Sequence, residues 1–353
     1  MFLLKNLTQI DGVSGNEEKV REYIKKEIEA VVDEIKVDKV GNLIAYKKGT
    51  GSKFKLLLSA HMDEVGFIVT GYSEDGMVKF RPVGGIDQRV LPGKRVLIGD
   101  KGVKGVIGCK PIHLQEKDER DKTIKIKSMY IDIGCDKRDE AEKLAGLGEY
   151  IAFDSKYTEL GPDCVKAKAL DDRAGCAIIM ELLKNRYEFD LYASFTVQEE
   201  IGLRGSEVVG YQINPDVAFV IEGTTCSDVP GAKEHEYSTE LGKGPVITVM
   251  DRTAYADKEL VNFIYDTARK HKIDVQFKKT ATGGNDAGKI QRSRCGVKVA
   301  SISVPCRYIH SPSSVMSMKD YEGCKRLMEA VLTELESNND YSLKILNGGN
   351  CNV

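Results

Sequence analysis

Apolar residues along the chain follow two different spacings. Strand-like apolar segments occur at 54–58, 165–170, 191–197, 217–221 and 300–304. Between them, apolar residues recur every three or four positions at 20–31, 173–183, 258–270 and 319–335, which predicts amphipathic helices. This alternation predicts an α/β fold, with a mixed sheet between two helical layers.

Residues 70–161 have a different pattern. Short β-like runs alternate there with Gly and Pro, which favours a small barrel or sandwich. We therefore expect a discontinuous α/β catalytic domain, residues 1–69 and 162–353, with an inserted β-barrel-like domain at 70–161.

Three local predictions accompany this division. Ser14 and Glu17 have the spacing of a capping box at the start of the first amphipathic helix. Segments 37–46 and 54–60, separated by turn residues, read as a strand pair. The tail at 347–350 is expected to be frayed.

Composition narrows the function classes. The 353 residues are 41% hydrophobic and 30% charged, with a formal net charge of −2 and no basic stripe, so a nucleic acid is not expected as partner. No stretch has the roughly 20 apolar residues needed to cross a bilayer. The first residues lack a signal peptide, so the expected location is the cytoplasm.

The polar residues that follow the predicted strands carry the chemistry. His61 comes after the first apolar segment, and each later segment is followed by a candidate ligand: Asp171, the pair Glu199 and Glu200, Glu222, and His310. Sites in α/β sheets form beyond the carboxyl ends of strands. Two imidazoles and several carboxylates are a ligand set for two divalent metal ions.

The sequence offers one residue for each role in such a site. Asp171 could bridge the ions, His61 and Glu222 could complete one, and Glu200 and His310 the other. Three carboxylates would leave one positive charge of two divalent ions, which a bridging hydroxide would neutralise. Glu199 remains as the general base.

Two further residues fit this arrangement. Asp63 is placed to hydrogen-bond the far side of a ligating imidazole, although the sequence does not decide which histidine it holds. Glu199 and Glu200 can face one site only if their strand ends there, because neighbours within a strand point to opposite faces. Gly202 and Gly205 supply that break.

Four segments together resemble a known family. His61–Gly66, Ala169–Gly175, Gln198–Gly205 and Tyr308–Pro312 are similar to the motifs of the dinuclear metalloaminopeptidases. This group comprises the tetrahedral and glutamyl aminopeptidases and includes proteins once labelled cellulase M. The motifs follow the family's order and extend over most of the chain.

The resemblance implies the metal and base roles given above. It also implies a cis bond between Asp171 and Asp172, and assembly into a hollow dodecamer through the inserted domain. The loop Thr282–Asp286 either lines the substrate cleft, as the resemblance suggests, or forms a plain turn. Many members have Asp where this chain has Glu222, so Asp228 is kept as a second candidate ligand.

The leading hypothesis is an aminopeptidase that releases N-terminal amino acids from peptides through a hydroxide bridging two metal ions. Zinc and cobalt are the first candidates and manganese is possible, since such ligands accept all three. One alternative is a glycoside hydrolase, which needs two carboxyl groups and no metal. The other is a non-catalytic oligomeric scaffold. The preferred N-terminal residue cannot be derived from the spacing.

Overall fold

The structure is a computed structural model that describes residues 2–51 and 54–337; the tail predicted at 347–350 lies outside them. The helices are α1 (Phe2–Leu7), α2 (Glu18–Ile28), α3 (Lys117–Arg120), α4 (Arg138–Leu144), α5 (Leu170–Leu182), α6 (Arg204–Ile213), α7 (Lys258–Lys270), α8 (Ala287–Gln291) and α9 (Met318–Ser337). Short 3₁₀ turns are η1 (Gln88–Val90), η2 (Ile112–Leu114), η3 (Ile126–Ser128) and η4 (Glu234–Glu236).

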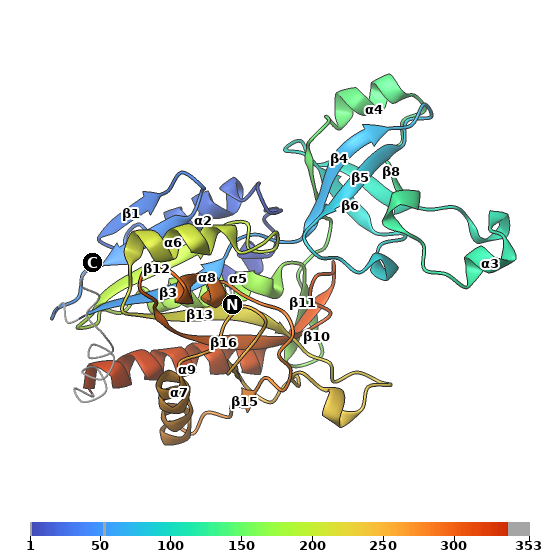
Figure 1. Cartoon of the computed structure of the whole chain (residues 1–353). Coiled ribbons are helices and arrows are strands. Elements are labelled where there is room, and N and C mark those ends of the chain that lie inside the picture. Colours follow the sequence, from blue (N-terminus) through green and yellow to red (C-terminus); the bar gives the residue numbers. More distant parts are fainter. Residues whose placement is uncertain (1, 52–53, 338–353) are drawn as a thin grey trace.

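The larger part of the molecule is built on a mixed sheet (Figure 1). Its strands are β1 (Glu34–Val37), β2 (Leu43–Lys47), β3 (Lys55–His61), β10 (Thr158–Leu160), β11 (Cys164–Ala167), β12 (Asp190–Thr196), β13 (Val217–Thr225), β14 (Val246–Thr248), β15 (Gln276–Phe277), β16 (Lys298–Arg307) and β17 (Ser314–Ser317). The main order is β1-β2-β12-β3-β13-β16-β17-β11-β10, and β14 joins β16 to β15.

The central strands β12, β3, β13 and β16 run parallel to one another. They are buried almost throughout, as their apolar composition predicts. Helices α5, α7 and α9 pack on one side of the sheet, and α6 and α8 pack on the other. The predicted α/β/α arrangement is confirmed.

The inserted part is a closed antiparallel barrel with its own apolar core. Its strands, in the order β4-β5-β8-β7-β6-β9, are β4 (Gly66–Tyr72), β5 (Val78–Val83), β6 (Arg95–Ile98), β7 (Val103–Gly108), β8 (Tyr130–Asp132) and β9 (Tyr150–Phe153). The barrel stands away from the sheet in Figure 1, and the segment carrying α3 projects from it. The chain enters the barrel directly after His61 and returns to the sheet at β10.

Three local expectations need correction. Segments β2 and β3 do not pair with each other, because β12 lies between them and residues 34–47 form the β1–β2 hairpin instead. The helix α2 begins at Glu18 with Glu17 at its N-cap and no side-chain capping bond, so the capping box is wrong. The helix α6 was not expected, since Gly205 and Gly210 weaken its helical signal.

Candidate metal centre

The predicted site residues meet at the carboxyl edge of the parallel strands. His61 is the last residue of β3, and Glu199 and Glu200 follow the end of β12 at Thr196. His310 lies in the connection between β16 and β17. Glu222 differs from expectation, because β13 continues past it to Thr225. Parallel pairing brings these ends to one edge of the sheet.

Asp171 lies between the two histidines. Its Oδ1 is 3.3 Å from His61 Nε2, and its Oδ2 is 3.6 Å from His310 Nε2. Asp171 stands at the start of α5, where its backbone is not helical, and the Asp171–Asp172 peptide bond is cis, as the family resemblance implied. One carboxylate therefore faces both imidazoles.

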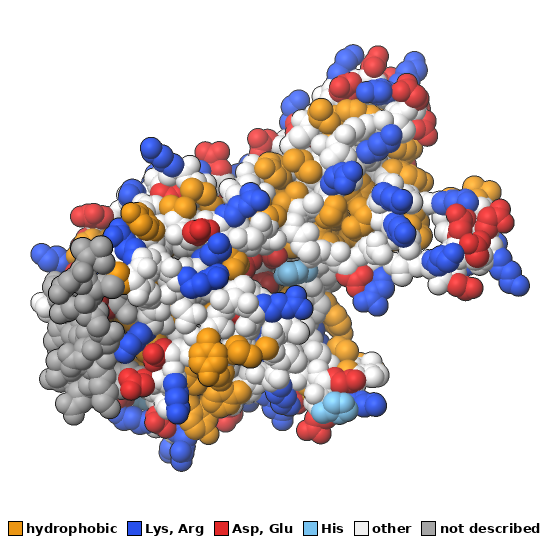
Figure 2. Space-filling view, viewed as in Figure 1, with side chains coloured by type: hydrophobic (Ala, Val, Ile, Leu, Met, Phe, Trp, Pro, Cys, Tyr) orange, Lys and Arg blue, Asp and Glu red, His pale blue; other side chains and the backbone are white. Residues whose placement is uncertain are grey.

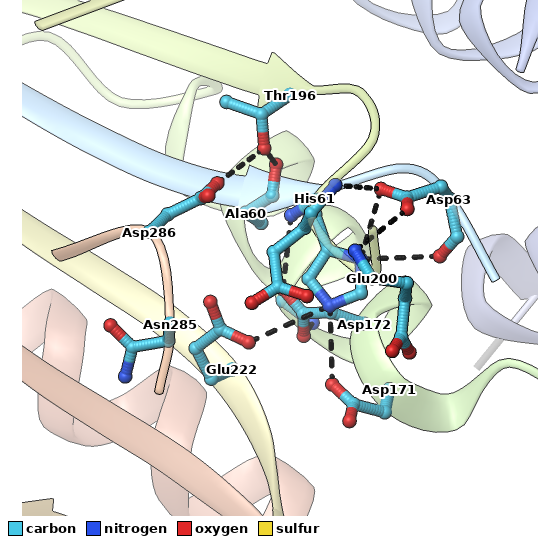
Figure 3. Close-up of polar contacts among 12 residues, drawn as sticks. Ala60, His61, Asp63, Asp171, Asp172, Thr196, Glu200, Glu222, Asn285 and Asp286 are labelled. Carbon is cyan, nitrogen blue, oxygen red and sulfur yellow. Dashed lines mark hydrogen bonds and ion pairs between the residues drawn. The ribbon is translucent and has the colours of Figure 1, made fainter. Parts of the chain in front are cut away.

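Each histidine also faces a second carboxylate. Glu222 Oε2 is 3.6 Å from His61 Nε2, on the side of the ring that Asp171 also faces (Figure 3). Glu200 Oε2 is 3.3 Å from His310 Nε2. Among the described residues, three groups have ligand atoms within 4.8 Å of one another: His61, Asp171 and Glu222; Asp171, Glu200 and His310; and His61, Glu199 and Glu200.

Asp63 occupies the opposite side of the His61 ring, which answers the question left open by the sequence. His61 Nδ1 is 3.1 Å from the Asp63 carbonyl oxygen and 3.4 Å from its Oδ1. The Asp63 side chain is fully buried and also accepts the backbone N–H groups of Glu199 and Glu200, at 3.0 and 3.1 Å. Asp63 thus holds a histidine and the turn after β12 at the same time.

Asp172, next to Asp171, hydrogen-bonds to the backbone of neighbouring elements. Its Oδ2 accepts the N–H of His61 at 3.3 Å and its Oδ1 accepts that of Gly175 at 2.9 Å. The side chain is fully buried. It therefore ties the start of α5 to the end of β3, and none of the three metal-ligand groups includes it.

Burial dominates the electrostatics of the glutamates. It raises the pKa of Glu199 and Glu222 well above 4.5, and that of Glu200 to about 7. Neighbouring carboxylates add to each increase, while the histidines oppose it. Burial lowers the pKa of His61, but Asp171 and Asp63 outweigh that effect and raise it well above 6.5.

The donor set fits divalent cations. Buried oxygens normally have hydrogen-bond partners, yet Glu222 Oε1 has none among the described residues. Imidazole nitrogens and carboxylate oxygens are ligands of zinc, cobalt and manganese. Cations would also compensate the buried negative charge that otherwise raises the carboxyl pKa values.

The barrel contributes to this centre through the loop after β5. A Cβ on Gly85 would lie 3.6 Å from His310 Nδ1, and a Cβ on Gly84 would lie 3.4 Å from the Cβ of Glu200. Burial lowers the pKa of His310, but Asp171, Glu200 and the Gly85 backbone raise it to about 9. The inserted domain therefore borders the site directly.

A cavity of about 570 Å³ opens beside the cluster. The residues that line it include His61, Asp171, Glu199, Glu200, Glu222 and His310. They also include Thr248, Thr253, Lys278, Ser303 and the loop 282–285. The Gly-rich loop therefore lines the cavity, as the resemblance suggested. No helix in residues 2–51 and 54–337 is both long and apolar enough to span a bilayer.

Sequence reasoning missed two residues near the site and proposed one that does not belong there. Lys278 lines the cavity but was missed, because nothing in its sequence spacing marks it. Asp286, the second missed residue, accepts a hydrogen bond from Thr196 Oγ1 at 2.5 Å. The second candidate ligand, Asp228, is engaged elsewhere: both its oxygens contact Arg307, at 2.9 and 2.6 Å.

The protein has a cluster of imidazoles and carboxylates at the carboxyl edge of a mixed α/β sheet. This combination places it in the class of metal-dependent α/β enzymes. Comparison with known proteins makes this specific. The profile of the M42 glutamyl aminopeptidase family matches residues 41–327. The chain belongs to the M42 family.

The relatives are similar to this chain over nearly its whole length. It is 40% identical to a putative aminopeptidase of Acetivibrio thermocellus over 332 residues, which cover 93% of this chain and 97% of that one. The structure of a TET aminopeptidase from a marine sediment archaeon of the Thaumarchaeota has a TM-score of 0.93, with 35% identity and 98% of both chains covered.

A third relative is known as an assembly. The Pyrococcus horikoshii TET1 peptidase, which can assemble into a tetrahedron or a large octahedral shell, is 36% identical, with a TM-score of 0.83. The match covers 94% of this chain and 98% of that one. The resemblance stated from the motifs is confirmed: the chain is a metal-dependent aminopeptidase, not a glycosidase.

Proposed function

We propose that this aminopeptidase acts through two divalent ions that share Asp171. The observation that carries the proposal is the position of Asp171, with one oxygen 3.3 Å from His61 Nε2 and the other 3.6 Å from His310 Nε2. His61 and Glu222 would complete one ion, and Glu200 and His310 the other. The unpartnered Oε1 of Glu222 supports its role, because the longer side chain still has an oxygen free to ligate.

When bound, the ions supply Lewis-acid polarisation of the scissile carbonyl and lower the pKa of coordinated water. Glu199 acts as general base, accepting a proton from the attacking water and delivering it to the leaving amine. Burial raises the pKa of this carboxyl group above its usual value, which makes it a better proton acceptor. Asp63 keeps His61 oriented and fixes the backbone of Glu199. Zinc, cobalt and manganese all suit this ligand set.

The cavity supports release of one N-terminal residue at a time from a peptide. The free α-amino group would lie beside the carboxylates of the metal centre, and the first side chain would occupy the part lined by Thr248, Thr253 and Lys278. Lys278 Nζ donates to the Thr282 carbonyl oxygen at 2.9 Å, and burial lowers the Lys278 pKa. A lysine among threonines favours an acidic or polar first residue.

This preference is testable with a panel of aminoacyl substrates. Lys278→Met should lower kcat/KM for glutamyl and aspartyl substrates by about tenfold or more, because a charge-assisted contact is lost. Its effect on leucyl substrates should be several times smaller. An equal loss on all substrates would remove Lys278 from side-chain selection.

The proposed mechanism is tested by Glu199→Gln. The variant should keep its fold and both ions, measured by circular dichroism and elemental analysis, while kcat falls at least about 100-fold, as expected when a general base is lost. Glu207→Gln is the matched control, since Glu207 is an exposed glutamate in α6. Activity of Glu199→Gln within a few-fold of the parent enzyme would refute the assignment.

We further propose that the inserted barrel joins subunits into a dodecamer, while the rest of the chain forms the catalytic domain. The assembly known for the TET1 peptidase supports this. The barrel strands run from Gly66 in β4 to Phe153 in β9, so the insert begins and ends slightly earlier than the expected residues 70–161. Figure 2 shows hydrophobic side chains gathered on the barrel, over β4, β5 and β6, and again over α7 and β15. Exposed apolar clusters of this kind mark protein interfaces.

A further inference from the structure

Ser14 and Glu17 do not cap the helix that follows them. No side-chain bond caps α2, although the spacing of the two residues is that of a capping box. Both side chains are nearly completely buried, with 2% and 5% exposed, and neither lines the cavity. Two buried polar side chains at this position therefore serve something other than the helix.

Glu17 contacts the turn that carries Glu199 and Glu200 directly, and Ser14 contacts Asp63, which holds the same turn. Glu17 Oε1 accepts the N–H of Gln198 at 3.0 Å, and also that of Gly15 at 2.7 Å. Ser14 Oγ donates to Asp63 Oδ2 at 2.6 Å. The segment 14–17 thus reaches a turn more than 180 positions later in the chain.

Together these contacts fix three consecutive backbone N–H groups. Gln198 donates to Glu17, and Glu199 and Glu200 donate to the two oxygens of Asp63. Ser14 Oγ donates to Asp63 Oδ2, the oxygen that also accepts the Glu200 N–H. The carboxylate oxygens of Glu17 and Asp63 therefore fix the backbone positions from which the Glu199 and Glu200 side chains extend.

This turn needs such support because its backbone is unfavourable. Gln198 has φ = 58°, in the left-handed region that residues with a Cβ rarely adopt. The ladder of β12 ends at Thr196, so the N–H groups of residues 198–200 depend on Glu17 and Asp63, while the carbonyl groups of Gln198 and Glu199 accept bonds from later residues of the same turn. An unsupported turn would relax and move the Glu199 and Glu200 side chains.

We infer that Ser14 and Glu17 are positioning residues for the general base: Glu17 holds Gln198, and Ser14 holds Asp63, so that Glu199 and Glu200 point into the metal centre. The inference rests on the role proposed above for Glu199. It assigns to the N-terminal segment a part in catalysis without contact with substrate, cofactor or reacting atoms.

The experiment compares variants that keep or remove the hydrogen-bonding atoms. Glu17→Gln keeps the acceptor for the Gln198 N–H, whereas Glu17→Met has similar length and no acceptor. Ser14→Thr keeps the hydroxyl and Ser14→Ala removes it. Ser317→Ala is the control, because Ser317 is also a buried serine and its hydroxyl accepts the N–H of Asp320 at the start of α9, away from the turn.

Hydrogen–deuterium exchange over residues 197–203 reports the turn directly and does not depend on activity. Glu17→Met should speed exchange of that peptide at least about tenfold, while Glu17→Gln and Ser317→Ala leave it unchanged. Glu17→Met and Ser14→Ala should lower kcat about 10- to 100-fold with KM within twofold, the usual effect of losing a partner of a site residue. Ser14→Thr and Glu17→Gln should restore most of kcat.

Unchanged exchange and unchanged kcat in Glu17→Met would overturn the inference, as would equal losses in the conservative and disruptive variants. If Glu17→Met does not fold, the Ser14→Ala and Ser14→Thr pair decides by the same criteria. Failure of the Glu199 assignment is a separate result: exchange would still quicken in Glu17→Met, but Glu199→Gln would remain active.

Discussion

Of the carboxylates in the cluster, Asp171 is the one that contacts both histidines, whereas Glu222 faces His61 and Glu200 faces His310. The two halves of the centre are therefore chemically alike, each with an imidazole and a carboxylate of its own. Loss of one histidine should consequently affect one half far more than the other.

His61→Ala is expected to lose one of two ions per chain and to keep the other, since Glu200, His310 and Asp171 remain. Elemental analysis after desalting measures the content. His113→Ala serves as control because His113 is exposed on the barrel segment. Two ions retained by His61→Ala would refute the ligand assignment.

Asp228 stabilises the fold through Arg307. Burial raises the pKa of Asp228, but the paired contact with Arg307 outweighs it and holds the pKa below 3.8. Asp228→Asn should lower the free energy of unfolding by roughly 1–3 kcal/mol, as for hydrogen bonds to charged groups. Its metal content should stay the same.

The sign of the pH dependence follows from the lowered pKa. The stabilisation is fully present above pH 3.8 and disappears as the pH falls through the folded-state pKa. Thermal unfolding should therefore separate parent and Asp228→Asn at pH 6 and bring them together in strong acid. A gap that widens on acidification would contradict this origin.

At the residue scale, the convergence of the candidate ligands could be predicted, because the ends of parallel strands meet at one edge of a sheet. His61, Glu200 and His310 follow directly from that rule. Ser14 and Glu17 could not be assigned, because a capping box is a local pattern and their real partners, Asp63 and Gln198, depend on contacts between distant segments. Lys278 was unpredictable for the same reason.

At the scale of elements, β13 and α5 lie very close together at Gly223. The absence of a side chain on Gly223 leaves room for Asp171, the proposed bridging ligand. A Cβ on Gly223 would lie 2.9 Å from the Cα and Cβ of Asp171. Gly223→Ala should therefore displace Asp171 and weaken metal binding by about tenfold or more, while adding roughly 1–3 kcal/mol of packing strain.

Titration with a chelator measures this change in metal affinity. Gly146→Ala is the matched control, because a Cβ there would make only ordinary contacts, at 3.5 Å from Glu149. Equal metal affinity in Gly223→Ala and the parent would mean that β13 does not set the position of Asp171.

Helices with a clear three-to-four-residue spacing of apolar positions were predicted well. The pairing of strands within the sheet was not. Helix α7 begins and ends where its apolar spacing predicts. The pairing of β2 with β12 could not be read from sequence, since either strand can accept any apolar neighbour. Helix α6 was missed because Gly205 suggests a turn. The structure requires glycine there for another reason, since a Cβ on residue 205 would lie only 2.3 Å from Asn42 Oδ1.

At the scale of the molecule, the barrel segment exposes side chains suited to an interface. Ile112 and Leu114 are 68% and 59% exposed. If this segment joins subunits, Ile112→Glu combined with Leu114→Glu should lower the assembled mass, because charge at an apolar contact is costly.

Mass photometry distinguishes the species. The control combines Val37→Glu with Val40→Glu, which are exposed valines near the β1–β2 hairpin. Dodecamers of unchanged mass in the Ile112 and Leu114 variant, or equal dissociation in the control, would exclude this segment from the interface.

The attachment of the barrel has a consequence for regulation. The chain leaves His61 and enters β4 almost at once, and the loop at Gly85 borders His310. If the barrel joins subunits as proposed, a displacement of the barrel would therefore reach both imidazoles through few intervening residues. By thermodynamic reciprocity, any influence of association on cation affinity must be matched by an equal influence of cations on association. If the proposed dodecamer forms, the metal supply would then influence how much of it is assembled.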